Sequence, residues 1–322
     1  MLRKIMFAAI ACGMLNAASI TGVGASFPLP IYKEWSKLYY KSTGEMVNYS
    51  GGGSGKGVAS ISSQTSDFGG SDEPLKEQVL KEKNLIQFPA IIGAVVLGYN
   101  LPGLNDLRLD AGTLAMIYSG EITKWNDAKI SSLNPNAKLP NEEIIVITRS
   151  DSSGTTFNCT SYLSSDLKWQ HKYGSAKSIN WDAKVLPAAS NPLVATLINK
   201  TKYSIGYLEY AYAKDMSKVW LKNSAGEFIE PSPASFAKAS ANANFSAQNG
   251  FYKILVNASG LGSYPLVAAS FILMHKDGKN NASVIKFFNW ALSDESAKNA
   301  ARKLGYEPLD EVSVKEIKKH LQ

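Results

Sequence analysis

The sequence predicts an α/β protein in which mostly parallel sheets are flanked by helices. Short apolar stretches of strand length alternate along the chain with stretches whose apolar residues recur at helical spacing. This alternation is typical of parallel strands that are joined by helices. The chain has 322 residues, of which 45% are hydrophobic, and this is enough for two ordinary domains with sizeable cores.

The first half of the chain has clear strand and helix signals. Pro28 and Pro30 lie where proline is tolerated, in the first turn of a helix that Gly44 should end. A glycine stretch then leads into a second helix, which contains Val58 and Ile61. Strands or extended chain are expected at residues 20–23, 46–49, 66–69, 85–99 and 144–148, and a further helix is expected at 111–118.

The second half of the chain continues this alternation. The segment 224–249 is rich in Ser, Ala, Asn and Pro and has few large apolar residues, so we expect a loop-rich surface there. Cys159 falls inside an expected helix and is interpreted as a small buried residue rather than a reactive thiol. Helices are expected at residues 153–163, 194–200, 284–292 and 295–304, and strands at 204–208 and 266–274.

The N-terminus has the pattern of a secretory signal. A short basic start precedes an apolar run over residues 5–15, which is too short to span a bilayer, and small residues follow at 17–19. We therefore expect residues 1–18 to be cleaved and the mature protein to be exported to the periplasm. Two alternatives are a buried strand or short helix at this end, and a lipid anchor on Cys12.

Composition argues against several classes of function. The formal net charge of +7 falls by two when Arg3 and Lys4 are removed, and the lysines are scattered without interleaved aromatics, so nucleic-acid binding is not expected. Lys56 is followed by glycine rather than the Ser or Thr of a nucleotide-binding P-loop. Neither Ser54 nor Ser153 lies in a hydrolase G-x-S-x-G elbow, and the three histidines lack metal-ligand spacing. No cofactor or metal is expected.

Four short segments rich in glycine and hydroxyl residues carry the functional signal. Each lies at an expected helix start, where unpaired N–H groups and a partial positive charge can bind an anion. Taken singly, each of their serines could be an ordinary N-cap. Taken together, three such starts could converge at the carboxyl edge of a sheet. The segments are residues 24–27, 53–56, 70–72 and 149–155.

Two charged residues specify the kind of anion. Arg149 can meet phosphate oxygens with a planar fork of donors, and Asp151 could hold its guanidinium, unless the two form only a surface ion pair. Asp72 would repel an anion unless the anion brings a hydrogen for the carboxylate to accept. Phosphate near neutral pH has such a hydrogen and ionised sulfate does not, so Asp72 predicts phosphate selectivity. The alternative role for Asp72 is a helix N-cap.

With these residues, the chain resembles the periplasmic phosphate-binding proteins of high-affinity phosphate ABC transporters. The resemblance implies a two-lobed periplasmic-binding-protein fold of type II, in which a monomer clamps inorganic phosphate between hinged lobes and delivers it to an inner-membrane permease. Lobe 1 would comprise residues 19–97 and 266–322, and lobe 2 residues 98–265. The motifs that carry the resemblance lie at residues 21–28, 47–51, 67–72, 149–155, 205–211 and 264–267, in the same order over nearly the whole mature chain.

The resemblance also implies a role for each matching residue. Asp72 would accept the hydrogen of the ligand, and Arg149 would pair with phosphate while Asp151 orients it. Ser26 stands where the family often has threonine, and Lys56, where a small residue is usual, is expected to face solvent. The implied phosphate-binding residues are Ser26, the backbone of Phe27, Ser54, Asp72, Arg149, Ser153, Gly154 and Thr155.

Two rival functions remain open from the residues alone. An envelope phosphatase would need turnover of phosphate esters and a nucleophile or metal. A sulfate or molybdate receptor would share the architecture but should lack the acceptor at Asp72.

Overall fold

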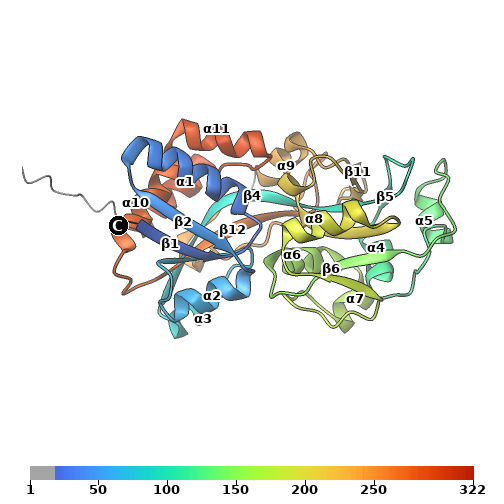
Figure 1. Ribbon diagram of the computed structural model, residues 1–322, viewed down its shortest axis with the longest axis horizontal. Coiled ribbons are helices and arrows are strands. Elements are labelled where there is room, and N and C mark those ends of the chain that lie inside the picture. Colours follow the sequence, from blue (N-terminus) through green and yellow to red (C-terminus); the bar gives the residue numbers. More distant parts are fainter. Residues whose placement is uncertain (1–18, 242) are drawn as a thin grey trace, which may run out of the picture.

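The computed structural model describes residues 19–241 and 243–322, and it has two α/β lobes side by side (Figure 1). The expected signal over residues 1–18, with Cys12, lies outside the described residues. The α/β class is confirmed. No helix in the described part of the chain is long and apolar enough to cross a membrane.

The first lobe is built from the two ends of the chain. In Figure 1, α1 and α11 lie above its strands, and α2 and α3 lie below them. Its N-terminal elements are β1 (Ser19–Gly24), α1 (Leu29–Thr43), β2 (Met46–Gly51), α2 (Ser54–Ser62), β3 (Phe68–Ser71), α3 (Glu77–Glu82) and β4 (Leu85–Tyr99). Its C-terminal elements are β12 (Val267–His275), α10 (Asn281–Ser293), α11 (Glu295–Leu304) and α12 (Glu311–His320).

The middle of the chain supplies the second lobe and the segment that leads back from it. Its elements begin with β5 (Arg108–Leu109), α4 (Ala111–Tyr118), α5 (Ala128–Leu133), β6 (Ile145–Arg149), α6 (Gly154–Leu163), α7 (Leu167–Lys172), β7 (Val185–Ala188) and α8 (Asn191–Lys200). They continue with β8 (Ser204–Glu209), η1 (Tyr210–Tyr212), β9 (Ser217–Lys218), β10 (Trp220–Lys222), β11 (Phe228–Ile229), α9 (Pro233–Ser240) and η2 (Ala247–Asn249). The residues at which one lobe ends and the other begins stay a prediction.

One long strand connects the sheets of the two lobes. The strand order is β2-β1-β3-β12-β4-β8-β6-β7, and β4 contributes to both halves. Its residues 85–94 pair with β12, whereas residues 95–99 pair with β8. The outer pairs β1–β2, β1–β3, β6–β7 and β6–β8 are parallel, as expected. The central pairs β3–β12, β12–β4 and β4–β8 are antiparallel.

Most of the expected elements lie within one to three residues of the observed ones. Gly44 ends α1 with a left-handed φ of 75°, a conformation that glycine adopts without steric cost. The loop expected over 224–249 is wrong in part, because α9 forms there. Ser232 and Ser235 make a reciprocal capping box at its start, and Phe236 is fully buried. One buried aromatic and a good cap therefore stabilise a helix that composition alone does not indicate.

Aromatic packing fixes the helix that follows the first functional segment. On α1, Tyr32 stacks on Trp35 and meets Phe288 edge to face, and Trp35 Nε1 donates to the carbonyl of Ala297 at 3.0 Å. The start of α1 is therefore held rigidly against the rest of its lobe.

Cys159 is 1% exposed, in agreement with its interpretation as a buried residue.

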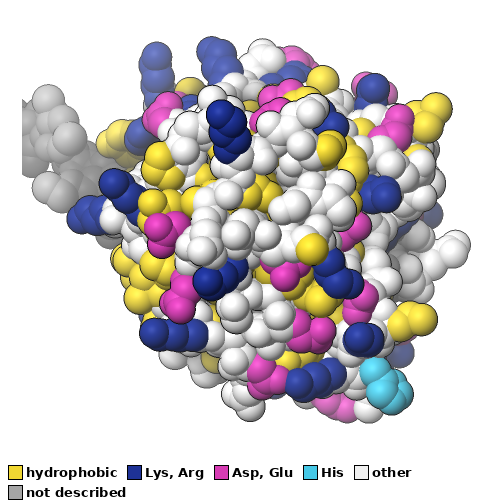
Figure 2. Space-filling view, turned by 90° about the vertical axis from the view of Figure 1, so that its right-hand side faces the viewer, with side chains coloured by type: hydrophobic (Ala, Val, Ile, Leu, Met, Phe, Trp, Pro, Cys, Tyr) yellow, Lys and Arg dark blue, Asp and Glu magenta, His cyan; other side chains and the backbone are white. Residues whose placement is uncertain are grey.

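The surface of the second lobe carries charges of both signs. Figure 2 shows its outer end, where Lys and Arg side chains are separated by Asp, Glu and uncharged groups. No large basic patch is visible on this face, which agrees with the expectation that the scattered lysines are solvated.

Candidate functional site

The structure brings the four segments together where the two lobes face each other. Ser54 Oγ is the meeting point of three of them. It accepts one hydrogen bond from the backbone N–H of Asp72 and another from the N–H of Gly154, each at 3.1 Å. Ser54 and Asp72 belong to the first lobe and Gly154 to the second, so these bonds join the lobes at the site.

The hydroxyls of this site are largely not helix caps. The N-cap of α1 is Pro28 and that of α2 is Gly53, and neither Ser26 nor Ser54 makes a capping hydrogen bond. Of the site's serines Ser26, Ser54 and Ser153, only Ser153 caps a helix, because its Oγ accepts from Thr156 N at 3.2 Å. The simple capping interpretation therefore fails for Ser26 and Ser54, and their hydroxyls are available for another role.

Asp72 lies in the loop after β3, and no helix starts there. The interpretation as an N-cap is wrong, since α3 begins at Glu77 with Lys76 as its cap. Asp72 is 2% exposed, and burial raises the pKa of its carboxyl to about 7. A hydrogen bond from Ser270 and the charge of Arg149 act against that rise. This carboxyl therefore changes protonation state near neutral pH.

Arg149 forms the ion pair expected from the sequence, and the pair is not on the surface. Its Nε and Nη2 donate to the two carboxylate oxygens of Asp151 at 2.6 and 2.5 Å. The Arg149 side chain is 1% exposed and that of Asp151 is 14% exposed. The fork geometry holds the guanidinium in one orientation, with its remaining Nη1 directed to Thr155 Oγ1 at 3.3 Å.

Backbone N–H groups at three chain positions add further donors. Within residues 19–241 and 243–322, the N–H groups of Phe27, Ser54 and Thr155 have no hydrogen-bond acceptor. All three lie before or within the first turn of α1, α2 or α6, where the helix dipole adds positive potential. The arrangement combines uncharged donors, one fixed guanidinium and one buried carboxyl, and it suits a small oxyanion.

Asn191 is a site residue that sequence reasoning missed. It is fully buried at the first position of α8 and contacts both Ser26 and Thr155. The sequence prediction began this helix at Val194, which left Asn191 in a loop. A signal was present, because Ser190 is a good N-cap and Pro192 fits the first turn, so the helix start could have been placed here.

The chain is also similar to known proteins over nearly its whole length. A model of the PBP superfamily domain matches residues 15–295. The phosphate-binding protein PstS of Pasteurella multocida is 45% identical over 325 residues, which cover 98% of this chain and 93% of that protein. PstS of Haemophilus influenzae is 45% identical over 311 residues, which cover 94% and 92%. The chain belongs to the PstS family.

A solved structure has a similar fold. It is a high-affinity periplasmic phosphate-binding protein with bound phosphate, and the match covers 94% of this chain and 93% of that protein. The TM-score is 0.78 at 19% sequence identity, so this likeness shows the fold alone.

One departure from the family pattern, Lys56, lies two residues after Ser54. Lys56 is exposed on α2, as expected, and the same helix start contacts the second lobe through Gly55 N, which donates to Ser152 O at 3.0 Å. A further interlobe contact lies nearby, where Lys177 Nζ is 2.5 Å from Glu73 Oε2. The structure therefore has the two lobes in contact around the site.

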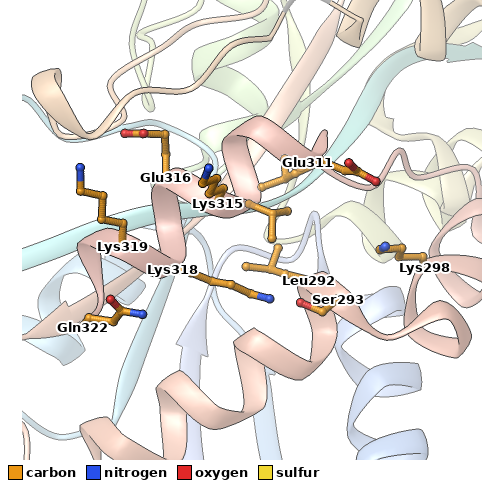
Figure 3. A pocket seen from close by; sticks show the side chains of 11 residues that line it. Leu292, Ser293, Lys298, Glu311, Lys315, Glu316, Lys318, Lys319 and Gln322 are labelled. Atoms are coloured by element: carbon orange, nitrogen blue, oxygen red, sulfur yellow. The ribbon is translucent and has the colours of Figure 1, made fainter.

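A separate groove lies between α12 and the end of α10 (Figure 3). It has a volume of about 700 Å³ and is lined by Lys298, Lys315, Lys318 and Lys319, but also by Glu311 and Glu316. Its open shape and mixed charges contrast with the buried site between the lobes, and none of the PstS-like site residues lines it.

Proposed function

We propose that this protein captures inorganic phosphate between its two lobes and delivers it to the permease of an ABC transporter for import. One observation carries the proposal: a buried carboxyl, Asp72, stands among hydrogen donors that come from both lobes. A site made only of hydrogen-bond donors would bind any tetrahedral oxyanion. A carboxylate among them favours an anion that brings its own hydrogen, which is the property that separates phosphate from sulfate near neutral pH.

The proposed phosphate contacts divide between charge and hydrogen bonding. Arg149 supplies the one full positive charge, and Asp151 keeps its guanidinium in place. Asp72 accepts the hydrogen of the ligand. The remaining donors are the hydroxyls and backbone N–H groups of Ser26, Phe27, Ser54, Ser153, Gly154 and Thr155.

Closure of the lobes is the proposed signal to the permease. Ser26, Ser54 and Asp72 lie on the first lobe, and Arg149 with the start of α6 lies on the second. Only the closed arrangement gathers donors from both, so phosphate stabilises that arrangement over an open one. A permease that recognises the closed form then receives the loaded protein in preference to the empty one.

The site is proposed to bind phosphate without transforming it. Ser54 Oγ is held by two backbone N–H donors, whereas a nucleophilic serine needs a base that removes its proton. We also propose that the protein acts as a monomer in the periplasm after cleavage of residues 1–18, with lobes at residues 19–97 and 266–322 and at 98–265. The PstS relatives, which are named as phosphate-binding proteins, support binding without turnover.

Isothermal titration with two anions tests the proposed function. Phosphate should bind tightly with one site per chain at neutral pH, and sulfate should compete only weakly at the same ionic strength. Tight sulfate binding, or release of phosphate from a phosphate ester by the protein, would contradict the proposal.

A further inference from the structure

Asn191 connects one hydroxyl of each lobe. Its side-chain amide Nδ2 donates to Ser26 Oγ and to Thr155 Oγ1, each at 3.1 Å, and its backbone N–H donates to Ser26 Oγ at 3.2 Å. The amide cannot be turned over, because Asn191 Oδ1 accepts the backbone N–H of Glu209 at 3.1 Å. Both hydrogens of Nδ2 are therefore directed at the two hydroxyl oxygens.

These contacts occupy the acceptor capacity of both hydroxyls. A hydroxyl oxygen has two lone pairs and one hydrogen. Ser26 Oγ accepts twice from Asn191, and Thr155 Oγ1 accepts from Asn191 and from Arg149 Nη1 at 3.3 Å. Each hydroxyl can then interact with a ligand only by donating its hydrogen.

A third hydroxyl of the site, that of Ser54, is also limited to donating its hydrogen, but by backbone groups rather than by Asn191. Ser54 Oγ accepts from the N–H groups of Asp72 and Gly154, so backbone donors occupy both of its lone pairs. Ser54 is set as a donor by the chain itself once the lobes meet. Ser26 and Thr155 depend on the Asn191 side chain to be set as donors.

We propose that Asn191 is a positioning residue that fixes the hydroxyl hydrogens of Ser26 and Thr155 toward the bound oxyanion. The inference rests on the proposed phosphate binding and adds a reason for its selectivity. Because the hydroxyls of Ser26, Thr155 and Ser54 cannot accept, a hydrogen on the ligand has its acceptor at Asp72. The site thus distinguishes ligands by where they carry a hydrogen, and no hydroxyl has to reorient when phosphate enters.

Three single variants separate this role from simple packing. Asn191→Asp keeps the size of the side chain and its acceptor for Glu209, but its carboxylate draws the two hydroxyl hydrogens away from the ligand. Asn191→Ala leaves the hydroxyls free to rotate and still donate. Ser190→Asp is the matched control, because it places the same charge one residue earlier and aspartate also caps a helix.

Titration with inorganic phosphate should order these variants clearly. We expect Asn191→Ala to weaken binding about tenfold, Asn191→Asp to weaken it more than about a hundredfold, and Ser190→Asp to change it only a few fold. If Asn191→Asp binds phosphate as well as Asn191→Ala does, or if Ser190→Asp is as weak as Asn191→Asp, the proposal is wrong. The wild-type titration tests phosphate binding itself, so the two inferences fail separately.

A double-mutant cycle with Thr155→Val gives a second, independent measurement. Asn191 and Thr155 lie on the same lobe, so coupling between them on phosphate affinity does not report contact between the lobes. In the Thr155→Val background the effect of Asn191→Ala should shrink at least about twofold, because one of the two oriented hydroxyls is gone. An unchanged effect would show that Asn191 does not act through this hydroxyl. Thermal melting of the phosphate-free variants reports any loss of folding.

Discussion

Ser270 Oγ donates a hydrogen bond to Asp72 Oδ1 at 2.9 Å in the wall of the first lobe. Ser270 lies on β12 and is fully buried, and Asp72 is 2% exposed. Within residues 19–241 and 243–322, no donor reaches the other carboxylate oxygen, Oδ2. Ser270 therefore fixes which oxygen of Asp72 is left to accept a hydrogen from the ligand.

This relationship determines what Asp72→Asn should do. Because Ser270 needs an acceptor, the amide oxygen should face Ser270 and the NH₂ group should face the ligand. The variant then donates a hydrogen bond to the ligand where the wild-type carboxylate accepts one. The hydrogen of phosphate would therefore face another donor, whereas an oxygen of sulfate would gain a hydrogen bond. We expect phosphate affinity to fall at least about tenfold and sulfate affinity to rise.

Competition titrations with both anions measure this change in selectivity. Asp277→Asn is a suitable control, since it makes the same substitution on the surface of the first lobe, where the Asp277 side chain is 77% exposed. A phosphate-to-sulfate ratio in Asp72→Asn equal to that of the wild type would remove Asp72 from selectivity.

The raised pKa of Asp72 also predicts how stability depends on pH without phosphate. The pKa is about 7 in the folded protein against 3.8 for an unperturbed group, so between these values the folded state holds a proton that the unfolded state has lost. The contribution of Asp72 is then fully present below about pH 4 and is lost as pH rises through 7. A rise of about three units corresponds to about 4 kcal/mol.

Denaturant unfolding of the phosphate-free protein at pH 5 and pH 8 measures this contribution. The wild type should lose stability relative to Asp72→Asn over this interval. The difference between the two proteins reports Asp72 together with its effect on the buried Glu209, whose pKa is raised by burial and by the charge of Asp72. Parallel pH profiles for the two proteins would contradict the assigned pKa.

The sequence was sufficient to predict the alternation of strands and helices and the four segments of the site. Segments such as 149–155 combine a strand end, a hydroxyl cluster and a helix start, and each of these can be recognised from neighbouring residues alone. The alternative role of Asp72 as an N-cap is wrong because the chain continues from Ser71 to Lys76 without a helix, and proline at position 74 does not by itself mark a helix start.

The contacts between the segments could not be predicted in the same way. Ser54 and Gly154 are separated by 100 positions, and Asn191 and Ser26 by 165. Their hydrogen bonds depend on how the two lobes meet, which no local pattern encodes. The burial of the Arg149–Asp151 pair has the same origin, since spacing in the sequence cannot distinguish it from a surface ion pair.

That buried pair makes Arg149→Ala the most damaging single change expected at the site. The variant removes the full positive charge and leaves the carboxylate of Asp151 without its partner. We expect phosphate affinity to fall by about two to three orders of magnitude in titration. Lys56→Ala, the matched loss of one positive charge from an exposed side chain, should change affinity less than about twofold. Equal losses in the two variants would mean that only net charge matters.

Gly154 should permit closure because it has no side chain. A Cβ at this position would lie 2.7 Å from Asp72 Cβ and 2.9 Å from Asp72 N, and closer still to Ser54 Oγ. Alanine is also the better helix former at the start of α6, so the phosphate-free protein should be as stable as the wild type or slightly more so. Gly154→Ala should therefore keep the lobes apart and weaken phosphate binding by more than about a hundredfold.

Small-angle scattering with and without phosphate distinguishes blocked closure from misfolding. The wild type should become more compact on adding phosphate, whereas Gly154→Ala should keep the larger radius of gyration. Gly112→Ala on α4 is the control, because a Cβ there meets no atom closer than 3.6 Å. If Gly154→Ala reaches the compact radius of gyration and binds phosphate as the wild type does, close contact between α6 and Asp72 is not needed to hold the ligand. The donors at the start of α6 would then have to act from a greater distance than the structure shows.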